Sequence, residues 1–555
     1  MAHSHEMLRE AISLQQAGRL EEAAGAYRRL REAHPEEPHV LFYAGSLELQ
    51  RGNAADALPL LESFVRKQPD RVEGVNALSH VYRMLQRPAD AAALWEGYAQ
   101  RCPADARGQY ELAVCRLAID DDDGARSALA AFLEGAGDTA EAHLSAALAW
   151  HGAARLGPAK EHYERVLALD PSLQLARQNL AAVWQTEGDL DRAQSLYRAV
   201  LDAEPANADV HRNLGTLYKS RGDLRQALIY YRDATLLERG PTQLDPAELL
   251  RRNPEARRTS LHSLRLEAEQ LEHLLALGRI ESAYRAQLAA YREIIDELTG
   301  PAFTGHRREL SDTQFRRIGH TMHRLFHTGP AAAIDGGALN PQLDFADIER
   351  SYRRSKDTGE GGIVVIDGFL TGEALRALRA WCLETTFWFD YTKAGGYSGA
   401  YMEQGFGNEL LLQLATELRD ALPNLLGPHA LGQMWAYIYD SAMSGITPHA
   451  DQAALNLNFW LTSDTANLDP DSGGLVIYTR EAPAEWDFAA YNSRPREIEA
   501  FAQDSPFVVV PHRCNRLVLF NSNLIHKTDS FRFRAGLQNR RINVTMLFGD
   551  RQGHS

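Results

Sequence analysis

HADQAALNLNFWL, residues 449–461, opens with a histidine and an aspartate two positions apart. In an extended chain, residues two apart point to the same side, so His449 and Asp451 can share one metal ion. We expect the third ligand to be His526, in the loop that follows a predicted strand at 517–520. Two imidazoles and one carboxylate on one face, with open coordination positions opposite, suit non-haem Fe(II) in an oxygen-activating site.

The sequence around this segment predicts a β-rich domain. Asn456 and Asn458 alternate with apolar residues, which indicates a strand with a wet interior face. Short apolar runs separated by turns predict strands at 434–439, 454–461, 475–478, 507–510, 517–520 and 542–548. A helix at 373–382, capped by Thr371, precedes them. We therefore expect residues 356–555 to form an all-β barrel or jelly roll flanked by helices.

This domain resembles the Fe(II)/2-oxoglutarate-dependent dioxygenases, which share a double-stranded β-helix and a His-x-Asp…His iron triad. By this resemblance His449, Asp451 and His526 are the metal ligands and catalytic residues. Matching segments surround them at 473–475 (GGL), 516–520 (RLVLF) and 541–548 (RINVTMLF). The resemblance implies Fe(II), 2-oxoglutarate and O2 as cofactors, and hydroxylation with succinate and CO2 as co-products. Related halogenases lack the carboxylate and place chloride there, so Asp451 favours hydroxylation.

The distal carboxylate of 2-oxoglutarate requires a fixed cation, and arginine offers it two parallel hydrogen bonds. Arg541 begins the last predicted strand and shares a face with Asn543 and Thr545, so it is the first candidate. Arg540 is the second, and surface solvation is the alternative for either. Further candidate contacts to the cosubstrate or substrate are Tyr437, Tyr439, Asn456 and Asn458. For the two tyrosines, core packing with a satisfied hydroxyl is the alternative.

Residues 1–241 contain a repeat with a period of 34 residues. A small residue recurs at Ala23, Ala57, Ala91, Ala125, Ala159, Ala193 and Ala227, each followed four positions later by a bulky apolar residue. Glycines at 18, 52, 188 and 222 and prolines at 35, 69, 103, 171 and 205 keep the same period. The alanine lets two helices approach, and the bulky residue fills the groove between them. Gly and Pro are typical of the ends of helices.

The pattern resembles the tetratricopeptide repeat (TPR) family, with GDLDRA at 188–193 and GDLRQA at 222–227. We therefore expect residues 1–241 to form an α-solenoid of about seven helical hairpins. The concave face of such an array commonly binds peptides or protein segments. Self-association, or spacing of the other domain, is the alternative role. The whole chain is thus expected to be a multidomain α + β protein.

Residues 242–355 are expected to form a helical connector between the array and the catalytic domain. Prolines at 241, 246 and 254 break the repeat register, and residues 261–298 show helical spacing of leucines. The connector can fix the array against the catalytic domain or provide a homodimer contact. The sequence leaves both roles open.

The composition excludes several classes of protein. Lys+Arg number 59 against Asp+Glu 74, and the net charge of −15 argues against a general nucleic-acid binder. No apolar run reaches the ~18 residues that a membrane span requires. The N-terminus lacks a signal-peptide pattern, and the four cysteines form no disulfide framework. We expect a cytoplasmic protein without a membrane partner.

The leading functional hypothesis is a protein or peptide hydroxylase whose repeat array recruits the substrate. Repeat arrays joined to such barrels resemble the prolyl 3-hydroxylases and the aspartyl/asparaginyl β-hydroxylases, although the latter lack the carboxylate that Asp451 supplies. One alternative is a small-molecule biosynthetic oxygenase that uses the array to hold a carrier or partner protein. Another is a non-catalytic scaffold with an inactive barrel. The target residue stays open.

Overall fold

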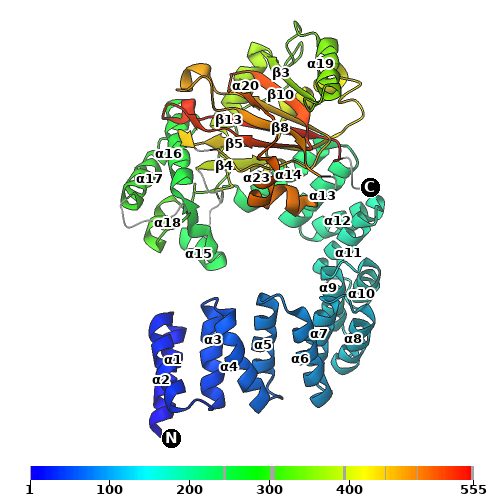
Figure 1. The fold of residues 1–555 in the computed structure, drawn as a ribbon, viewed down its shortest axis with the longest axis vertical. Helices are drawn as coiled ribbons and strands as arrows, with labels where there is room; N and C mark the ends of the chain where they lie inside the picture. The colour runs from blue at the N-terminus through cyan, green and yellow to red at the C-terminus, as the bar shows by residue number, and fades with distance from the viewer. Residues whose placement is uncertain are drawn as a thin grey trace. The chain divides into compact units, whose positions relative to one another are not determined.

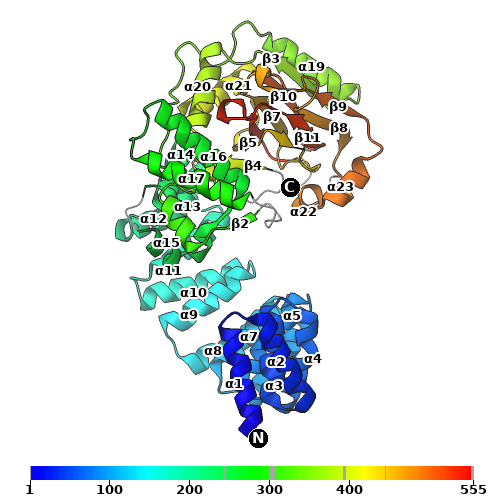
Figure 2. The same ribbon diagram turned by 90° about the vertical axis from the view of Figure 1, so that its left-hand side faces the viewer.

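The chain divides into two compact units, Met1–Ala203 and Glu204–Ser555, in the computed structural model. The structure describes residues 2–241, 245–299, 307–391, 396–443, 445–483 and 485–551. Helical hairpins make up the first unit and the start of the second, which ends in a domain of β-sheets and helices (Figure 1 and Figure 2). Of the helices that the structure describes, none is long and apolar enough to cross a membrane.

The 34-residue pattern folds into helical hairpins, which confirms the predicted repeat array. The seven alanines of the pattern are at most 1% exposed, and the bulky residues four positions later at most 2%. These positions therefore form the buried seam between the paired helices. The helices are α1 (Ala2–Gln16), α2 (Leu20–Ala33), α3 (Pro38–Gln50), α4 (Ala54–Lys67), α5 (Val72–Met84), α6 (Pro88–Arg101), α7 (Ala106–Leu117), α8 (Asp122–Ala136), α9 (Ala140–Gly152), α10 (Leu156–Leu169), α11 (Gln174–Thr186), α12 (Leu190–Ala203), α13 (Ala208–Ser220) and α14 (Leu224–Arg239).

The turn inside each hairpin contains one residue with left-handed backbone. Four of these residues are the glycines of the 34-residue pattern, with φ between 74° and 86°. In the other three hairpins the same position holds Gln86, Asp120 and Ala154, with φ of 57°, 57° and 58°. A left-handed conformation costs a residue with a Cβ roughly 1–2 kcal/mol. Helix packing in the hairpin, rather than local residue preference, therefore imposes the turn geometry.

Replacing Ala154 with glycine is expected to stabilise the repeat array by about 0.5–1 kcal/mol, because glycine adopts this turn without a Cβ clash. The measurement is the urea midpoint of unfolding, followed by circular dichroism. The matched control is Ala153→Gly at the preceding position, where φ is −91°. That change should lower stability, since it only adds backbone freedom to the unfolded chain. Equal shifts for both variants would contradict the argument.

A mainly helical segment follows the repeats. Its helix α16 is attached to the C-terminal domain, because the Gln270 amide donates to the carbonyls of Leu383 (3.2 Å) and Thr385 (3.0 Å). The segment also has a small core of its own, centred on α16 and α17. Its elements are α15 (Pro246–Arg252), η1 (Pro254–Arg257), β1 (Arg258–Ser260), α16 (Leu261–Ala276), α17 (Tyr284–Leu298), β2 (Arg307–Glu309), α18 (Asp312–Ile318) and α19 (Phe345–Asp357).

The C-terminal domain contains a six-stranded antiparallel sheet, in the order β3-β10-β7-β13-β5-β4, and a three-stranded sheet, in the order β11-β8-β9. Each of the six predicted strands overlaps one of these. The strands are β3 (Ile363–Asp367), β4 (Tyr397–Tyr401), β5 (Leu431–Tyr439), β7 (Leu455–Trp460), β8 (Leu475–Glu481), β9 (Phe507–Val510), β10 (Arg516–Asn521), β11 (Leu524–Thr528) and β13 (Ile542–Phe548).

The two faces of the six-stranded sheet have different neighbours. Leu457 and Leu519 pack against helices α20 (Gly372–Glu384) and α21 (Glu409–Ala421). Val518, from the opposite face of β10, packs against residues of β8, β9 and β11. Figure 2 shows α20 and α21 on one side of the sheet and β8, β9 and β11 on the other. The period-2 alternation of these strands thus separates a helix-covered face from a face that meets the smaller sheet.

The last helical hairpin belongs to the core of the second unit. Ala227 and Tyr231 on α14 are fully buried and share a hydrophobic cluster with Met434 of β5. On the preceding helix, Lys219 forms an ion pair with Glu403 of η2 (Met402–Gln404), with Nζ and Oε1 3.0 Å apart. The repeat pattern therefore continues past the point where the first compact unit ends.

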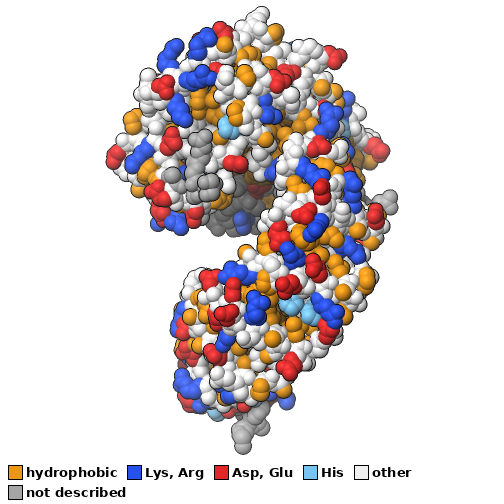
Figure 3. Space-filling model, turned by 90° about the vertical axis from the view of Figure 1, so that its right-hand side faces the viewer, with side chains coloured by type: hydrophobic (Ala, Val, Ile, Leu, Met, Phe, Trp, Pro, Cys, Tyr) orange, Lys and Arg blue, Asp and Glu red, His pale blue; other side chains and the backbone are white. Residues whose placement is uncertain are grey.

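Charged side chains of both signs are interspersed over the face of the molecule shown in Figure 3. Ion pairs also join neighbouring repeats. Arg155 pairs with Asp122 (2.8 Å), and Lys160 pairs with Glu187 (2.7 Å). Such partly exposed pairs typically contribute about 0–1 kcal/mol each, so the buried alanine and aromatic seam dominates the stability of the array.

Candidate metal centre

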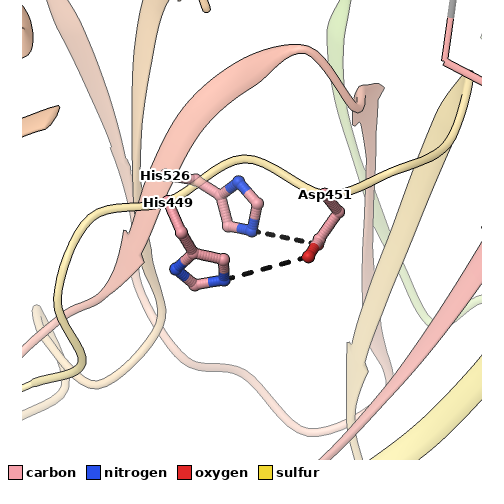
Figure 4. A group of neighbouring side chains, drawn as sticks. All are labelled: His449, Asp451 and His526. Atoms are coloured by element: carbon pink, nitrogen blue, oxygen red, sulfur yellow. Dashed lines mark ion pairs between the residues drawn. The ribbon is translucent and has the colours of Figure 1, made fainter. Parts of the chain in front are cut away.

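Three side chains converge on one point in the C-terminal domain, namely His449, Asp451 and His526 (Figure 4). Their ligand atoms lie within 4.8 Å of one another. His526 Nε2 is 3.4 Å from Asp451 Oδ2, and His449 Nε2 is 4.0 Å from Asp451 Oδ1. Asp451 and His526 are buried, and His449 is partly exposed. The group could bind a metal ion, and the described part of the chain holds no other such cluster.

Backbone carbonyls fix the orientation of both imidazoles. His449 Nδ1 lies 3.0 Å from the carbonyl oxygen of Thr447, and His526 Nδ1 lies 3.1 Å from that of Leu524. Because a carbonyl only accepts hydrogen bonds, each neutral ring carries its proton on Nδ1. Each Nε2 is then the basic nitrogen, and it is the atom that faces Asp451. Metal-binding histidines are commonly held in this way.

Backbone pairing brings the three residues together from distant positions. His449 and His526 form an antiparallel bridge, with N–H···O distances of 3.0 and 2.8 Å. The Ser522 hydroxyl donates to the carbonyl oxygen of Asp451 at 3.1 Å. The expectation that His526 lies in a loop is wrong. The turn after β10 occupies only residues 522–523, and His526 lies in β11, paired with β8.

A chain of hydrogen bonds runs from Asp451 across the sheet. The amide of Asn456 donates to Asp451 Oδ2 at 2.6 Å, and the amide of Asn458 donates to Asn456 Oδ1. On β13, Asn543 Nδ2 (3.3 Å) and Thr545 Oγ1 (2.8 Å) both donate to Asn458 Oδ1. Burial raises the pKa of Asp451, but His526 and His449 in their protonated form, together with the Asn456 amide, bring that pKa below the usual value. The carboxylate is therefore held charged and oriented.

Arg541 lies at the far end of this chain. Its Nη1 donates to Asn543 Oδ1 at 3.3 Å, and its Nε donates to the carbonyl of Gly473 at 2.6 Å. The guanidinium carbon is 4.6 Å from the ring centre of Tyr439. Arg541 is only 1% exposed, and this burial lowers its pKa. A cation buried among carbonyls and rings is costly to hold, and an anionic ligand would offset that cost.

The triad opens into a cavity of about 1390 Å³. The predicted residues Tyr437, Tyr439 and Asn458 line this cavity. Asn456 bonds directly to the triad aspartate, as described above. Arg540 has a different partner, because its Nε donates to Glu269 of α16 at 2.6 Å. Of the two candidate arginines, Arg541 is thus the one connected by hydrogen bonds to the candidate metal group.

Sequence reasoning missed one wall of this cavity. Tyr397 and Tyr401 of β4 and Trp435 of β5 line it. The segment YSGAY at 397–401 contains few apolar residues, so hydrophobic periodicity predicts no strand there. Its two tyrosines, each two positions from Gly399 and therefore on the same side of an extended chain, were the available signal. Phe488, half exposed, also lines the cavity from α22 (Phe488–Asn492).

Two family models match the chain, both described as tetratricopeptide repeat, over residues 8–72 and 185–244. Repeats of this family bind proteins and peptides. Solved structures with similarity include a tetratricopeptide repeat protein from Parabacteroides merdae, at 13% identity over 43% of this chain and 94% of that one, with a TM-score of 0.36. Another is YrrB, titled a TPR protein with an unusual peptide-binding site, at 19% identity over 31% and 88%, with a TM-score of 0.26. A thermophilic TPR protein of Thermus thermophilus matches at 21% identity over 33% and 99%, with a TM-score of 0.25. No curated protein matches the chain.

Proposed function

We propose that the C-terminal domain is an Fe(II)- and 2-oxoglutarate-dependent hydroxylase, and that the repeats recruit its protein or peptide substrate. The observation that carries this proposal is the hydrogen-bonded path from a two-histidine, one-carboxylate group to a buried arginine. A metal site alone would need no such connection. A cosubstrate that binds the metal at one end and presents a carboxylate at the other would account for both ends of the path.

The arrangement of the strands supports a double-stranded β-helix. The major sheet would comprise the six strands from β3 to β4, and the minor sheet β11, β8 and β9. His526 lies on β11 of the smaller sheet, and Asp451 lies just before β7 of the larger one. Residues of the metal group thus come from, or lie next to, strands of both sheets, as expected of a site between two layers.

The residues of the site fit both Fe(II) and 2-oxoglutarate. Two imidazole nitrogens and one carboxylate oxygen suit Fe(II) and leave coordination positions for other ligands. Arg541 offers a planar donor set for a carboxylate, and its hydrogen bonds go to two backbone carbonyls and one amide rather than to an acid. A dicarboxylate would bring the negative charge that this buried cation requires.

Bound together, Fe(II), 2-oxoglutarate and O2 supply the oxidation of a substrate C–H bond to C–OH, with succinate and CO2 as co-products. The protein's own groups position these reactants. The Nδ1 hydrogen bonds of His449 and His526 aim their Nε2 atoms at the metal position, and Asn456 holds the carboxylate of Asp451.

An anaerobic titration of the metal-free protein with Fe(II) and then 2-oxoglutarate tests this proposal. The expected result is a visible metal-to-ligand charge-transfer band that forms only when both are present. Arg541→Lys should weaken 2-oxoglutarate binding about 10–100-fold while Fe(II) binding stays, because lysine cannot reproduce the fork of hydrogen bonds.

The matched control is Arg540→Lys, since Arg540 bonds to Glu269 outside the cavity. This variant should form the same band as the wild-type protein, at the same concentrations of 2-oxoglutarate. Absence of the band in folded wild-type protein would refute the proposal and favour a scaffold with an inactive barrel. A band insensitive to Arg541→Lys would refute the assignment of the arginine.

A further inference from the structure

One wall of the cavity beside the metal centre is aromatic. Tyr397 and Tyr401 of β4 and Trp435 and Tyr437 of β5 all line the cavity. The rings of Tyr397 and Tyr437 meet edge to face, with centroids 5.1 Å apart. Faces of such rings carry partial negative charge and attract cations within about 6 Å. The wall is therefore suited to a positively charged group.

The register of the two strands creates this wall. Gly399 lies opposite Tyr437, and Tyr401 lies opposite Trp435 in the antiparallel pair. A Cβ on Gly399 would lie 3.1 Å from Tyr401 Oη and 3.1 Å from Tyr437 Cε1. The missing side chain thus allows the two tyrosines to approach, and their hydroxyl oxygens are 3.3 Å apart.

The hydroxyl hydrogens in this wall have a fixed direction. Tyr401 donates its only hydroxyl hydrogen to Asp390 Oδ2 at 2.9 Å. Tyr437 must then donate its own to the Tyr401 oxygen, because each phenol has one hydrogen. Burial raises the pKa of Tyr437 well above the usual value, so the phenol stays neutral. The Tyr437 oxygen is left as a hydrogen-bond acceptor toward the cavity.

The charges on the described residues that line the cavity also favour a positively charged ligand. Its carboxylates are Glu403, Asp451 and Asp550, and its one lysine or arginine is Lys219. Lys219 is paired with Glu403 at 3.0 Å. Asp451 belongs to the metal group. An acidic ligand side chain would find no unpaired lysine or arginine among these residues, whereas a basic one would find Asp550 at the exposed rim.

We infer that this cavity receives a basic side chain, lysine or arginine, of a peptide substrate. This inference rests on the proposed function, since it identifies the substrate class of the same site. The aromatic wall accepts the cation, the Tyr437 oxygen accepts one of its N–H hydrogens, and the Asp390–Tyr401 hydrogen bond fixes that polarity. Tyr437 is thus a specificity-determining residue, and Tyr401 is a positioning residue that acts through it.

Calorimetric titration of the full chain with three pentapeptides, acetyl-Ala-Ala-Xaa-Ala-Ala-amide, tests the inference. Xaa is lysine, arginine or norleucine, the last being a neutral straight-chain comparator. We expect the two basic peptides to bind about tenfold more tightly than the norleucine peptide. No metal or cosubstrate is added, so the result does not depend on whether the iron titration succeeds.

Three variants separate specificity from structure. Tyr437→Phe keeps the ring but removes the acceptor, and should reduce the preference to about twofold. Tyr401→Phe keeps the Tyr437 hydroxyl but removes the Tyr401 oxygen that accepts its hydrogen, so that Tyr437 can donate into the cavity. The preference for the basic peptides should therefore fall in this variant too. Tyr478→Phe, on β8 and outside the described lining, should keep the full preference.

Equal binding of the lysine and norleucine peptides by wild type would overturn the inference. A preference retained in both Tyr437→Phe and Tyr401→Phe would also overturn it, because the polarity of the wall would then be irrelevant. Absence of binding by all three peptides would count against it as well. If the iron band forms but no preference exists, the substrate class is refuted and the proposed hydroxylase stands.

Discussion

Replacement of Asp451 by alanine is expected to weaken Fe(II) binding by at least about 100-fold and to abolish hydroxylation. Asp451 is the sole anionic member of the three-residue group, and it is the residue that joins the group to the amide chain. Without it, two neutral imidazoles remain to hold a dication. The readouts are Fe(II) retention after desalting and succinate formation from 2-oxoglutarate.

A graded control for this prediction is Asn456→Ala. It leaves all three ligands in place but removes the 2.6 Å hydrogen bond to Asp451 Oδ2. Loss of such a supporting partner typically costs 10–100-fold in metal affinity, which is less than the loss of the ligand. Asn340→Ala breaks a comparable bond, to the Gly368 carbonyl at 2.8 Å, outside the cavity lining, and should leave Fe(II) binding unchanged. If Asp451→Ala retained iron as wild type does, the assigned metal group would be wrong.

The repeat array was predictable because each unit solves the same packing problem with the same residue types. Alanine at one position and a bulky residue four later recur at every unit, so the periodicity alone locates the buried seam. The backbone conformation of the turns was harder to predict from the sequence. Gln86 and Ala154 carry no local signal for positive φ and Asp120 only a weak one, so their place in the 34-residue register is the main indication.

In the C-terminal domain, alternation of polar and apolar residues predicted the strands that cross the core. The same alternation placed Asn456 and Asn458 on one shared face of the strand, where both are buried and take part in the hydrogen-bonded chain. His-x-Asp spacing and a distant histidine indicated the metal group. The position of His526 inside β11 was missed, because a two-residue turn between strands leaves little trace in hydrophobic periodicity.

Other parts of the site depend on tertiary contacts that no local pattern encodes. Arg540 and Arg541 are adjacent in sequence, yet one bonds to Glu269 of α16 and the other to Gly473 and Asn543. Strand alternation separates their directions but does not say which one joins the hydrogen-bonded chain to Asp451. The pairing of Tyr401 with Tyr437 likewise requires β4 to lie beside β5.

Removal of residues 1–241 is expected to unfold the C-terminal domain, whereas removal of residues 1–203 is expected to leave it folded. The first cut deletes α13 and α14, which carry Ala227 and Tyr231 into the hydrophobic cluster of the six-stranded sheet. Loss of one buried aromatic side chain typically costs about 3–5 kcal/mol. Loss of a whole helical hairpin removes several such contacts, so its cost is expected to be comparable with the roughly 5–15 kcal/mol that stabilise a typical domain.

Thermal unfolding by circular dichroism and limited proteolysis provide the comparison between the two truncated chains. Residues 204–555 should give one cooperative transition and keep the Fe(II)- and 2-oxoglutarate-dependent band. Residues 242–555 should show no cooperative transition and rapid digestion. Leu228→Ser in the chain 204–555 is expected to give a stability between those of the two truncated chains. Leu228 of α14 packs beside Gly407, and the serine places a polar group in that contact without removing the helix. If residues 242–555 fold and bind Fe(II) as well as residues 204–555 do, the last hairpin is a dispensable repeat rather than part of the core of the C-terminal domain.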